Sequence, residues 1–207
     1  MMSTFISGIL AGISISIGGT VFLLCESKII GALFFTVGLF CVCVFGFHLF
    51  TGKVCYVFDN DRSYALSLPL IWMGNLLGAL AAGSLLLQTR LAPALIEKAS
   101  AVCAAKLSQG YLSAFILAVF CNILIYIAVE GYRTIPHEIG KYLAILFGVT
   151  VFILCGFEHC VANMFYFTAG RAWSIRAVIL LLIMTVGNAA GGVLLPLLRR
   201  TIKKPAG

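Results

Sequence analysis

"GFEHCVANMF" occupies residues 156–165 and places an acid, Glu158, beside an imidazole, His159, between two long uncharged segments. Residues 142–157 before the pair and residues 160–170 after it contain no charged side chain. Ionisable side chains are rare in such apolar surroundings, and those that occur there usually serve a function. The pair therefore marks the first position in this chain at which to look for a site.

The composition around this motif is that of a membrane protein. Mean hydropathy is +1.11, 62% of the residues are hydrophobic and 10% are charged, which lies well outside the range of soluble globular domains. Six uncharged stretches approach the ~20 residues that a spanning helix needs. They are residues 5–24, 29–47, 64–88, 110–129, 142–157 and 177–198. We therefore expect an all-α membrane protein with six transmembrane helices, forming a single channel domain over residues 1–207.

The net charge of +7 raises the question of nucleic-acid binding, but the basic residues are not clustered on a soluble surface. Several of them lie in the C-terminal tail: Arg199, Arg200, Lys203 and Lys204. Lys and Arg beside membrane helices favour the cytoplasmic side. We therefore predict no nucleic-acid partner and a multi-pass protein of the cell (inner) membrane. With six spans, the N- and C-termini are both expected to be cytoplasmic.

The eight cysteines do not indicate a metal or redox site. No CxxC pair is present, and most of the cysteines lie in or beside apolar runs, where a buried cysteine behaves as a small hydrophobe. The chain also lacks paired histidines on one helix face, which argues against haem or di-metal chemistry. We predict no metal site, no cofactor and no enzymatic activity.

Two motifs repeat along the chain. "GFHLFTGKV" at residues 46–54 is followed 110 residues later by "GFEHCVANM" at residues 156–164. "GNLLG" at residues 74–78 is matched by "GNAAG" at residues 187–191. Each half predicts a helix, an interrupted helix and a helix with a Gly-Asn motif, and three spans per half would invert one half relative to the other. The two halves extend over about residues 1–95 and 108–207.

Inverted repeats with broken helices are typical of transporters and channels, whose substrate sites lie near the bilayer midplane. Here the second helix is interrupted at residues 48–53 and the fifth at residues 158–159. Unwound backbone at membrane depth is tolerated only where it is buried in protein or lines a water-filled cavity. We therefore expect Thr51 and His159 to face each other across a pathway.

These motifs resemble the formate/nitrite transporter family. "GFEHCVANMF" is similar to its "EHSxANM" signature, and "LFTG" at residues 49–52 to the loop of its second helix. "WMGNLLGAL" at residues 72–80 and "FCNILIYIAV" at residues 120–129 resemble its third and fourth helices. The resemblance implies an aquaporin-like protomer in a homopentamer, with one pore per protomer. It also implies that small monovalent anions of weak acids pass: formate, nitrite or hydrosulfide.

Carried over motif by motif, the resemblance places His159 at the central pore histidine of the family and Thr51 at the loop threonine opposite it. Asn122 matches the asparagine of the fourth helix. Lys106 matches a lysine at the outer approach to the pore, where it would concentrate anions.

Two neighbouring residues are ambiguous. Glu158 could face the pathway, but we favour a role in bonding the broken loop or a neighbouring subunit. His48 stands where the family commonly has Glu, and it serves either the loop structure or the pathway. The implied apolar constrictions are Leu49, Phe50 and Ile125 on the outer side, and Phe35, Leu39 and Phe152 on the inner side.

An apolar ring opposes a bare anion. Translocon scales give roughly 2.5–3.5 kcal/mol for an ionised side chain at the bilayer centre. Protonating an acid of pKa about 4 at pH 7 costs about 4 kcal/mol, which is comparable. A low-dielectric vestibule favours the neutral acid, and His159 either supplies the proton or holds the anion as imidazolium. The alternative is an aquaporin-like channel for neutral small solutes, but the chain has no NPA-like motif.

Overall fold

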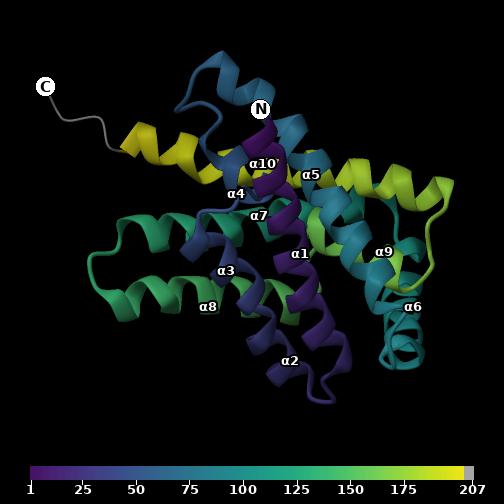
Figure 1. Ribbon diagram of the computed structural model, residues 1–207. Helices are drawn as coiled ribbons and strands as arrows, with labels where there is room; N and C mark the ends of the chain where they lie inside the picture. Colours follow the sequence, from purple (N-terminus) through teal and green to yellow (C-terminus); the bar gives the residue numbers. More distant parts are fainter. Residues whose placement is uncertain (203–207) are drawn as a thin grey trace, which may run out of the picture.

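The computed structural model describes residues 1–202, and all regular elements among them are helices (Figure 1). Lys203 and Lys204, which the sequence prediction includes in the cytoplasmic tail, lie outside the described residues. The longer helices are α1 (Met2–Leu24), α5 (Arg62–Leu86), α6 (Ala92–Ser108), α7 (Tyr111–Thr134), α8 (Glu138–Leu154) and α10 (Ile175–Ile202). The shorter ones are α2 (Lys28–Phe35), α3 (Val37–Phe45), α4 (Phe50–Lys53), the 3-10 turn η1 (Val54–Tyr56) and α9 (Cys160–Ala169).

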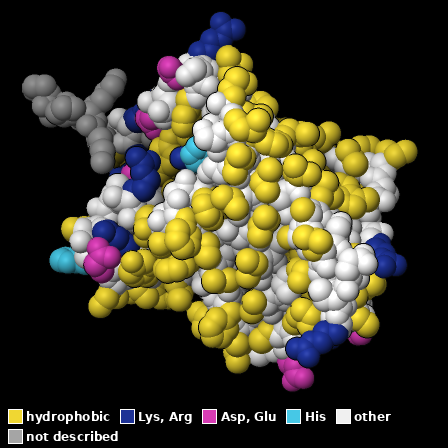
Figure 2. Space-filling view, viewed as in Figure 1, with side chains coloured by type: hydrophobic (Ala, Val, Ile, Leu, Met, Phe, Trp, Pro, Cys, Tyr) yellow, Lys and Arg dark blue, Asp and Glu magenta, His cyan; other side chains and the backbone are white. Residues whose placement is uncertain are grey.

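Five helical segments of the described chain are long and apolar enough to cross a membrane. They are α1, α2 with α3, α5, α7 and α10. Figure 2 shows apolar side chains over most of one face, with charged groups mainly around its rim. Large side chains such as Leu66, Phe147 and Leu182 are exposed on the outside, which is the arrangement expected where the solvent is lipid. The protein is therefore a multi-pass membrane protein.

Glycines allow two pairs of helices to approach closely: α1 packs along α5, and α7 packs along α10. A Cβ atom added to Gly12 would meet the carbonyl oxygen of Asn75, and one added to Gly191 would meet the carbonyl oxygen of Val119. Small residues are the usual means by which helix backbones pack tightly in lipid. The glycine contacts pair the start of α1 with the first half of α5, so these two helices run in the same direction.

The helices before the two repeated motifs stop at the same kind of turn. Gly46 and Gly156 both have φ +69°, in the left-handed region that glycine enters without steric cost. The chain then becomes helical again at Phe50 and at Cys160. Each motif thus consists of a glycine turn, a short non-helical segment and a short helix.

α9 lies in the middle of the molecule. All of its residues, Cys160–Ala169, are buried, and it contacts α1, α5, α6 and α10. A short helix that is buried on every side is enclosed by protein rather than by lipid. The non-helical segment in front of it therefore also lies within the protein, where side chains can satisfy its backbone.

The structure differs from the sequence prediction between residues 29 and 47, where one continuous helix was expected. Instead, α2 ends at Phe35 and α3 begins at Val37. The hydroxyl of Thr36 donates a hydrogen bond of 2.6 Å to the carbonyl of Leu33, and the Thr36 amide donates to the same oxygen. Threonine hydroxyls compete in this way for backbone groups and bend helices.

Candidate functional site

The loop before α4 is held by an asparagine of α5. The side-chain amide of Asn75 donates to the carbonyls of Gly8 (2.8 Å) and His48 (2.9 Å). Its oxygen accepts a hydrogen bond of 2.8 Å from the amide of Phe50. Asn75 is fully buried, so it satisfies backbone groups that neither water nor the interrupted helix can reach.

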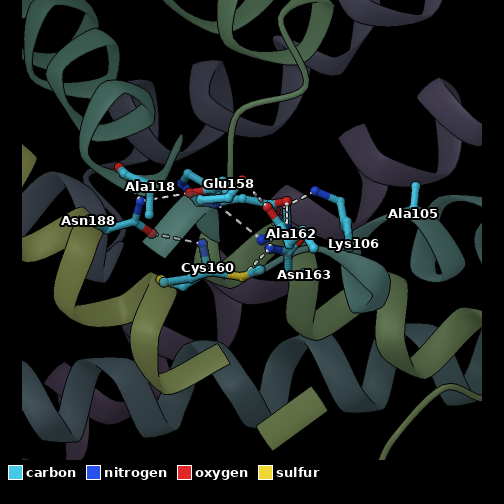
Figure 3. A network of polar contacts seen from close by, with 12 residues as sticks. Ala105, Lys106, Ala118, Glu158, Cys160, Ala162, Asn163 and Asn188 are labelled. Atoms are coloured by element: carbon cyan, nitrogen blue, oxygen red, sulfur yellow. Dashed lines mark hydrogen bonds and ion pairs between the residues drawn. The ribbon is translucent and has the colours of Figure 1, made fainter. Parts of the chain in front are cut away.

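The loop before α9 is held in the same way by an asparagine of α10 (Figure 3). The side-chain amide of Asn188 donates to the carbonyls of Ala118 and Glu158, both at 2.8 Å. Its oxygen accepts from the amide of Cys160 at 2.8 Å. The two short helices therefore begin at positions fixed by matching contacts from two different parts of the chain.

Thr51 and His159 meet where α4 and α9 begin. The Oγ1 atom of Thr51 lies 2.9 Å from Nε2 of His159, and both residues are buried. The ring of Phe152 stacks on the imidazole, with centroids 5.6 Å apart. The structure thus brings together the two residues that the sequence predicts to face each other.

The contacts of the imidazole fix its tautomer. Nδ1 of His159 accepts a hydrogen bond of 3.1 Å from the amide of Ala162, so Nδ1 carries no proton. In a neutral imidazole the proton then belongs to Nε2, which donates to Thr51. In an imidazolium, Nδ1 would also carry a proton, and two N–H donors, those of Nδ1 and of Ala162, would face each other with no acceptor between them. The observed geometry therefore fits a neutral His159, and the part of the imidazole in proton transfer or anion binding stays a prediction.

Asn122 and His48 lie beside this pair. The amide of Asn122 donates to the carbonyl of Thr51 at 3.0 Å and so fixes the start of α4 from the side of α7. The backbone amide of His48 lies outside the helices and donates a hydrogen bond of 2.9 Å to the hydroxyl oxygen of Ser7. Its ring atom Nδ1 is buried, with no hydrogen-bond partner among residues 1–202.

Glu158 forms a buried ion pair with Lys106 from the end of α6. The distance from Lys106 Nζ to Glu158 Oε2 is 2.5 Å, and Glu158 is 2% exposed. Asn163 and Gln109 also donate to the carboxylate, each at 2.7 Å. The expected role of Glu158 in bonding the broken loop applies to its carbonyl, which accepts from Asn188, while its side chain fixes Lys106. Sequence reasoning did not identify Gln109 or Asn163.

A cavity of about 710 Å³ opens at the opposite end of α7 from Lys106. Leu39, Leu49 and Gly52 line its inner part, and Lys53 and Arg133 lie among its polar lining residues. The inner end of the cavity therefore reaches the residues on either side of Thr51.

The predicted grouping of the apolar constrictions stays a prediction. It places Leu39 on the inner side and Leu49 on the outer side together with Lys106, and both leucines line this cavity. Lys106 precedes the start of α7, whereas Arg133 in this cavity lies in the last turn of α7. The two leucines therefore lie toward the end of α7 that is opposite Lys106.

Phe35 and Phe152 form the other apolar contact. Their rings meet edge to face, with centroids 5.8 Å apart. Phe35 also contacts Phe22, which contacts Tyr166, and Nζ of Lys106 lies 5.9 Å from the Tyr166 ring. This aromatic cluster therefore adjoins the Lys106 end of the molecule, across the Thr51–His159 pair from Leu39 and Leu49.

The family model for the formate/nitrite transporters matches residues 1–200 of this chain. The chain belongs to the formate/nitrite transporter family. A transporter of Bacillus subtilis is 35% identical over 69% of this chain and 58% of its own length. A probable formate transporter of Methanothermobacter thermautotrophicus is 33% identical over 81% of this chain and 72% of its own. The chain thus spans only part of the curated relatives that it matches.

The fold of this family member also matches solved channels. A structure described as a pentameric formate channel with formate bound superposes with a TM-score of 0.80 at 26% identity. The match covers 97% of this chain and 96% of the other. The helical fold described for residues 1–202 is therefore shared with this solved structure over nearly the whole chain.

Proposed function

We propose that this protein is a membrane channel for small monovalent anions of weak acids, with formate, nitrite and hydrosulfide as candidate substrates. Two related proteins are described by their names as a formate transporter and as a pentameric formate channel, which supports this substrate class. We further propose a homopentamer in the cell (inner) membrane with cytoplasmic N- and C-termini. Arg200 near the C-terminus bonds Phe58 and Asp59 just before α5, and α5 runs parallel to α1, so both termini belong at one end.

In this proposal the protomer has six membrane crossings in two inverted repeats. α2 and α3 with α4 form one interrupted crossing, and α8 with α9 forms the other. The matching hydrogen bonds of Asn75 and Asn188 support the repeat, since each fixes the start of a short helix. The short helices begin near the middle of the molecule and together form the centre of the pathway.

The hydrogen bond between Thr51 and His159 is the observation that carries the proposal. Because Nε2 of His159 donates to Thr51, the hydroxyl hydrogen of Thr51 is not used in that bond. No other hydrogen bond involves this hydroxyl in the described chain. The hydroxyl is therefore available to donate to a substrate molecule that reaches the centre, while the neutral imidazole holds the threonine in place.

Passage is assisted by neutralisation of the anion. Desolvation in a narrow apolar pathway disfavours the charged form, so the anion takes a proton from vestibule water as it enters the constriction. The required free energy is about 4 kcal/mol for an acid of pKa about 4 at pH 7, comparable with the charge penalty that it removes. Lys106 lies at one end of this pathway, where Glu158 holds its ammonium group in place and offsets its charge.

Apolar residues close the pathway on both sides of the central pair in this scheme. Leu49, Phe50 and Ile125, with Leu39, form the constriction that faces the large cavity. Phe35 and Phe152 form the constriction toward Lys106. All six of these side chains are buried, as constriction residues of a closed channel must be.

Uptake into proteoliposomes tests the proposal. Purified protein is reconstituted into liposomes, and formate, nitrite and hydrosulfide are supplied in parallel. Glycerol serves as the neutral control solute. We expect saturable uptake of at least one weak-acid anion, faster at lower pH, and no uptake of glycerol above that of empty liposomes. Glycerol uptake without anion uptake would favour the aquaporin-like alternative and contradict the proposal.

A further inference from the structure

In and around the large cavity at the Arg133 end, four basic side chains face two carboxylates. Asp59, at its mouth, pairs with Arg200. Glu130 accepts a hydrogen bond of 2.9 Å from Tyr56 and lies 3.4 Å from Arg199. Both acids of the cavity wall are therefore engaged by arginines of α10.

Two cations, Lys53 and Arg133, line the cavity itself. Lys53 Nζ has no ion pair or hydrogen bond within residues 1–202. Arg133 lies over the ring of Tyr56, 4.3 Å from its centroid, and its only carboxylate contact within residues 1–202 is a long one of 3.9 Å to Glu130, which Arg199 shares. An anion placed between Lys53 and Arg133 would be attracted by both.

Comparison of the two repeated motifs shows that this excess charge is specific to one end. Glu158 and Asn163 correspond, 110 residues earlier, to His48 and Lys53. At the Lys106 end, Glu158 neutralises Lys106 within a buried network that includes Gln109 and Asn163. At the Arg133 end, His48 stands in place of the acid, and the lysine, Lys53, belongs to the short helix α4 itself. The lysine at this end thus keeps its charge available.

We propose that Lys53 and Arg133 form a binding site for a small monovalent oxyanion in this cavity, where Lys53 follows Thr51 by two residues in α4. The inference rests on the proposed function and names where the anion waits before it crosses the Leu39–Leu49 constriction. Gly52 leaves space beside Lys53, since a Cβ atom there would have only a side-chain methyl of Val129 at 3.6 Å nearby. The site makes the channel saturate at a lower anion concentration from this end than from the Lys106 end.

Uptake of labelled formate into membrane vesicles of both orientations tests the site. Right-side-out and inverted vesicles present opposite ends of the channel to the added formate. With Lys53→Gln, we expect the half-saturating formate concentration to rise about fivefold in one orientation, as for loss of a partly exposed charge contact. The other orientation should change less than about twofold, and the maximal rate should be retained.

Two further variants separate charge from structure. Lys53→Arg keeps the charge and should keep the low half-saturating concentration, whereas a merely structural lysine would not be rescued in this way. Arg62→Gln removes an exposed cation at the same end, outside the cavity lining, and should leave uptake unchanged. Equal half-saturation of Lys53→Gln and unaltered protein in both orientations would overturn the site while leaving the channel function intact. Absence of uptake of formate, nitrite and hydrosulfide by the unaltered protein would instead contradict the function, and the site with it.

Discussion

Asn75 and Asn188 make the same three hydrogen bonds from opposite halves of the chain. Each amide donates to two carbonyls, one in a neighbouring helix and one in a loop, and each oxygen accepts the amide that begins a short helix. Both side chains are fully buried. Helices can be interrupted inside a membrane protein when side chains replace the lost backbone contacts. These two asparagines therefore position the starts of α4 and α9.

Replacing either asparagine should destabilise the protein strongly. Asn188→Ala leaves the amide of Cys160 and the carbonyl of Glu158 buried without the partner they have now, each worth about 1–3 kcal/mol. We expect the thermal unfolding midpoint in detergent to fall clearly, with partial loss of the oligomer. Asn188→Asp should be at least as harmful, because a carboxylate cannot donate to the carbonyls of Ala118 and Glu158.

Asn60→Ala is the matched control for this prediction. Its amide also donates to a carbonyl, that of Tyr56 at 2.8 Å, but the residue is exposed and water can replace the bond. The midpoint of this variant should move little. An Asn188→Ala protein as stable as Asn60→Ala would show that the loop before α9 does not depend on this asparagine.

The close approach of α7 and α10 gives a second prediction. Gly191→Ala places a methyl group on the carbonyl of Val119, and a backbone atom cannot move aside as a side chain can. Overpacking of this kind costs on the order of 3 kcal/mol, so expression and thermal stability should both fall. Gly110→Ala is the control, because a Cβ there has open space and no positive φ. Equal stability of the two variants, measured by thermal unfolding in detergent, would mean that the helices separate without penalty.

The Lys106–Glu158 pair predicts a non-additive result. Lys106→Met leaves a buried carboxylate without its counterion, which typically costs 3–5 kcal/mol. Glu158→Gln likewise leaves Lys106 unpaired, although the lysine is less buried. We expect the double variant to be more stable than Lys106→Met alone, because no uncompensated charge remains. Thermal unfolding of the unaltered protein, the two single variants and the double variant gives the coupling free energy between Lys106 and Glu158. Additive changes in stability would show that the two residues do not act as a unit.

Membrane class and family could be predicted from this sequence because both depend on local composition and on short motifs. The apolar runs indicate helices in lipid, and the motif around His159 identifies the family; both predictions are confirmed. Thr51 and His159 were expected to face each other across a pathway, because the two motifs occupy equivalent positions in their halves; the structure shows the two side chains in direct contact, and the pathway stays a prediction.

Other features depend on contacts that sequence separation hides. Gln109 and Lys106 reach Glu158 from about 50 residues away, and nothing in their own surroundings marks them as its partners. The grouping of Leu39 with Leu49 depends on the direction of each helix. The break between α2 and α3 at Thr36 depends on one hydroxyl that donates to a backbone carbonyl. Thr20 and Thr185 make similar bonds within helices that continue, so the residue type does not predict the break.

The Thr51–His159 pair gives the most direct test of the mechanism. Thr51→Val keeps the shape of the side chain but removes the hydroxyl that the imidazole positions and that donates to the passing acid. Uptake should fall about fivefold, as for loss of one hydrogen bond between neutral groups worth about 1 kcal/mol. Thr51→Ser keeps the hydroxyl and should retain most of the activity. Equal uptake by the valine and serine variants, at equal amounts of oligomer, would remove the hydroxyl from the pathway.

The pH profile of His159→Asn decides where the proton is carried. Asparagine can still accept the amide of Ala162, as it does at helix starts, but it cannot titrate. If the anion takes its proton from water in the vestibule, uptake by this variant should be slower at every pH but rise toward acid with the same slope as the unaltered protein. If the imidazole itself carried the proton, the variant would lose that dependence between about pH 5 and 8. Nδ1 of His159 already accepts a backbone amide, so we expect the slope to be preserved. Formate uptake into proteoliposomes across this pH range measures it.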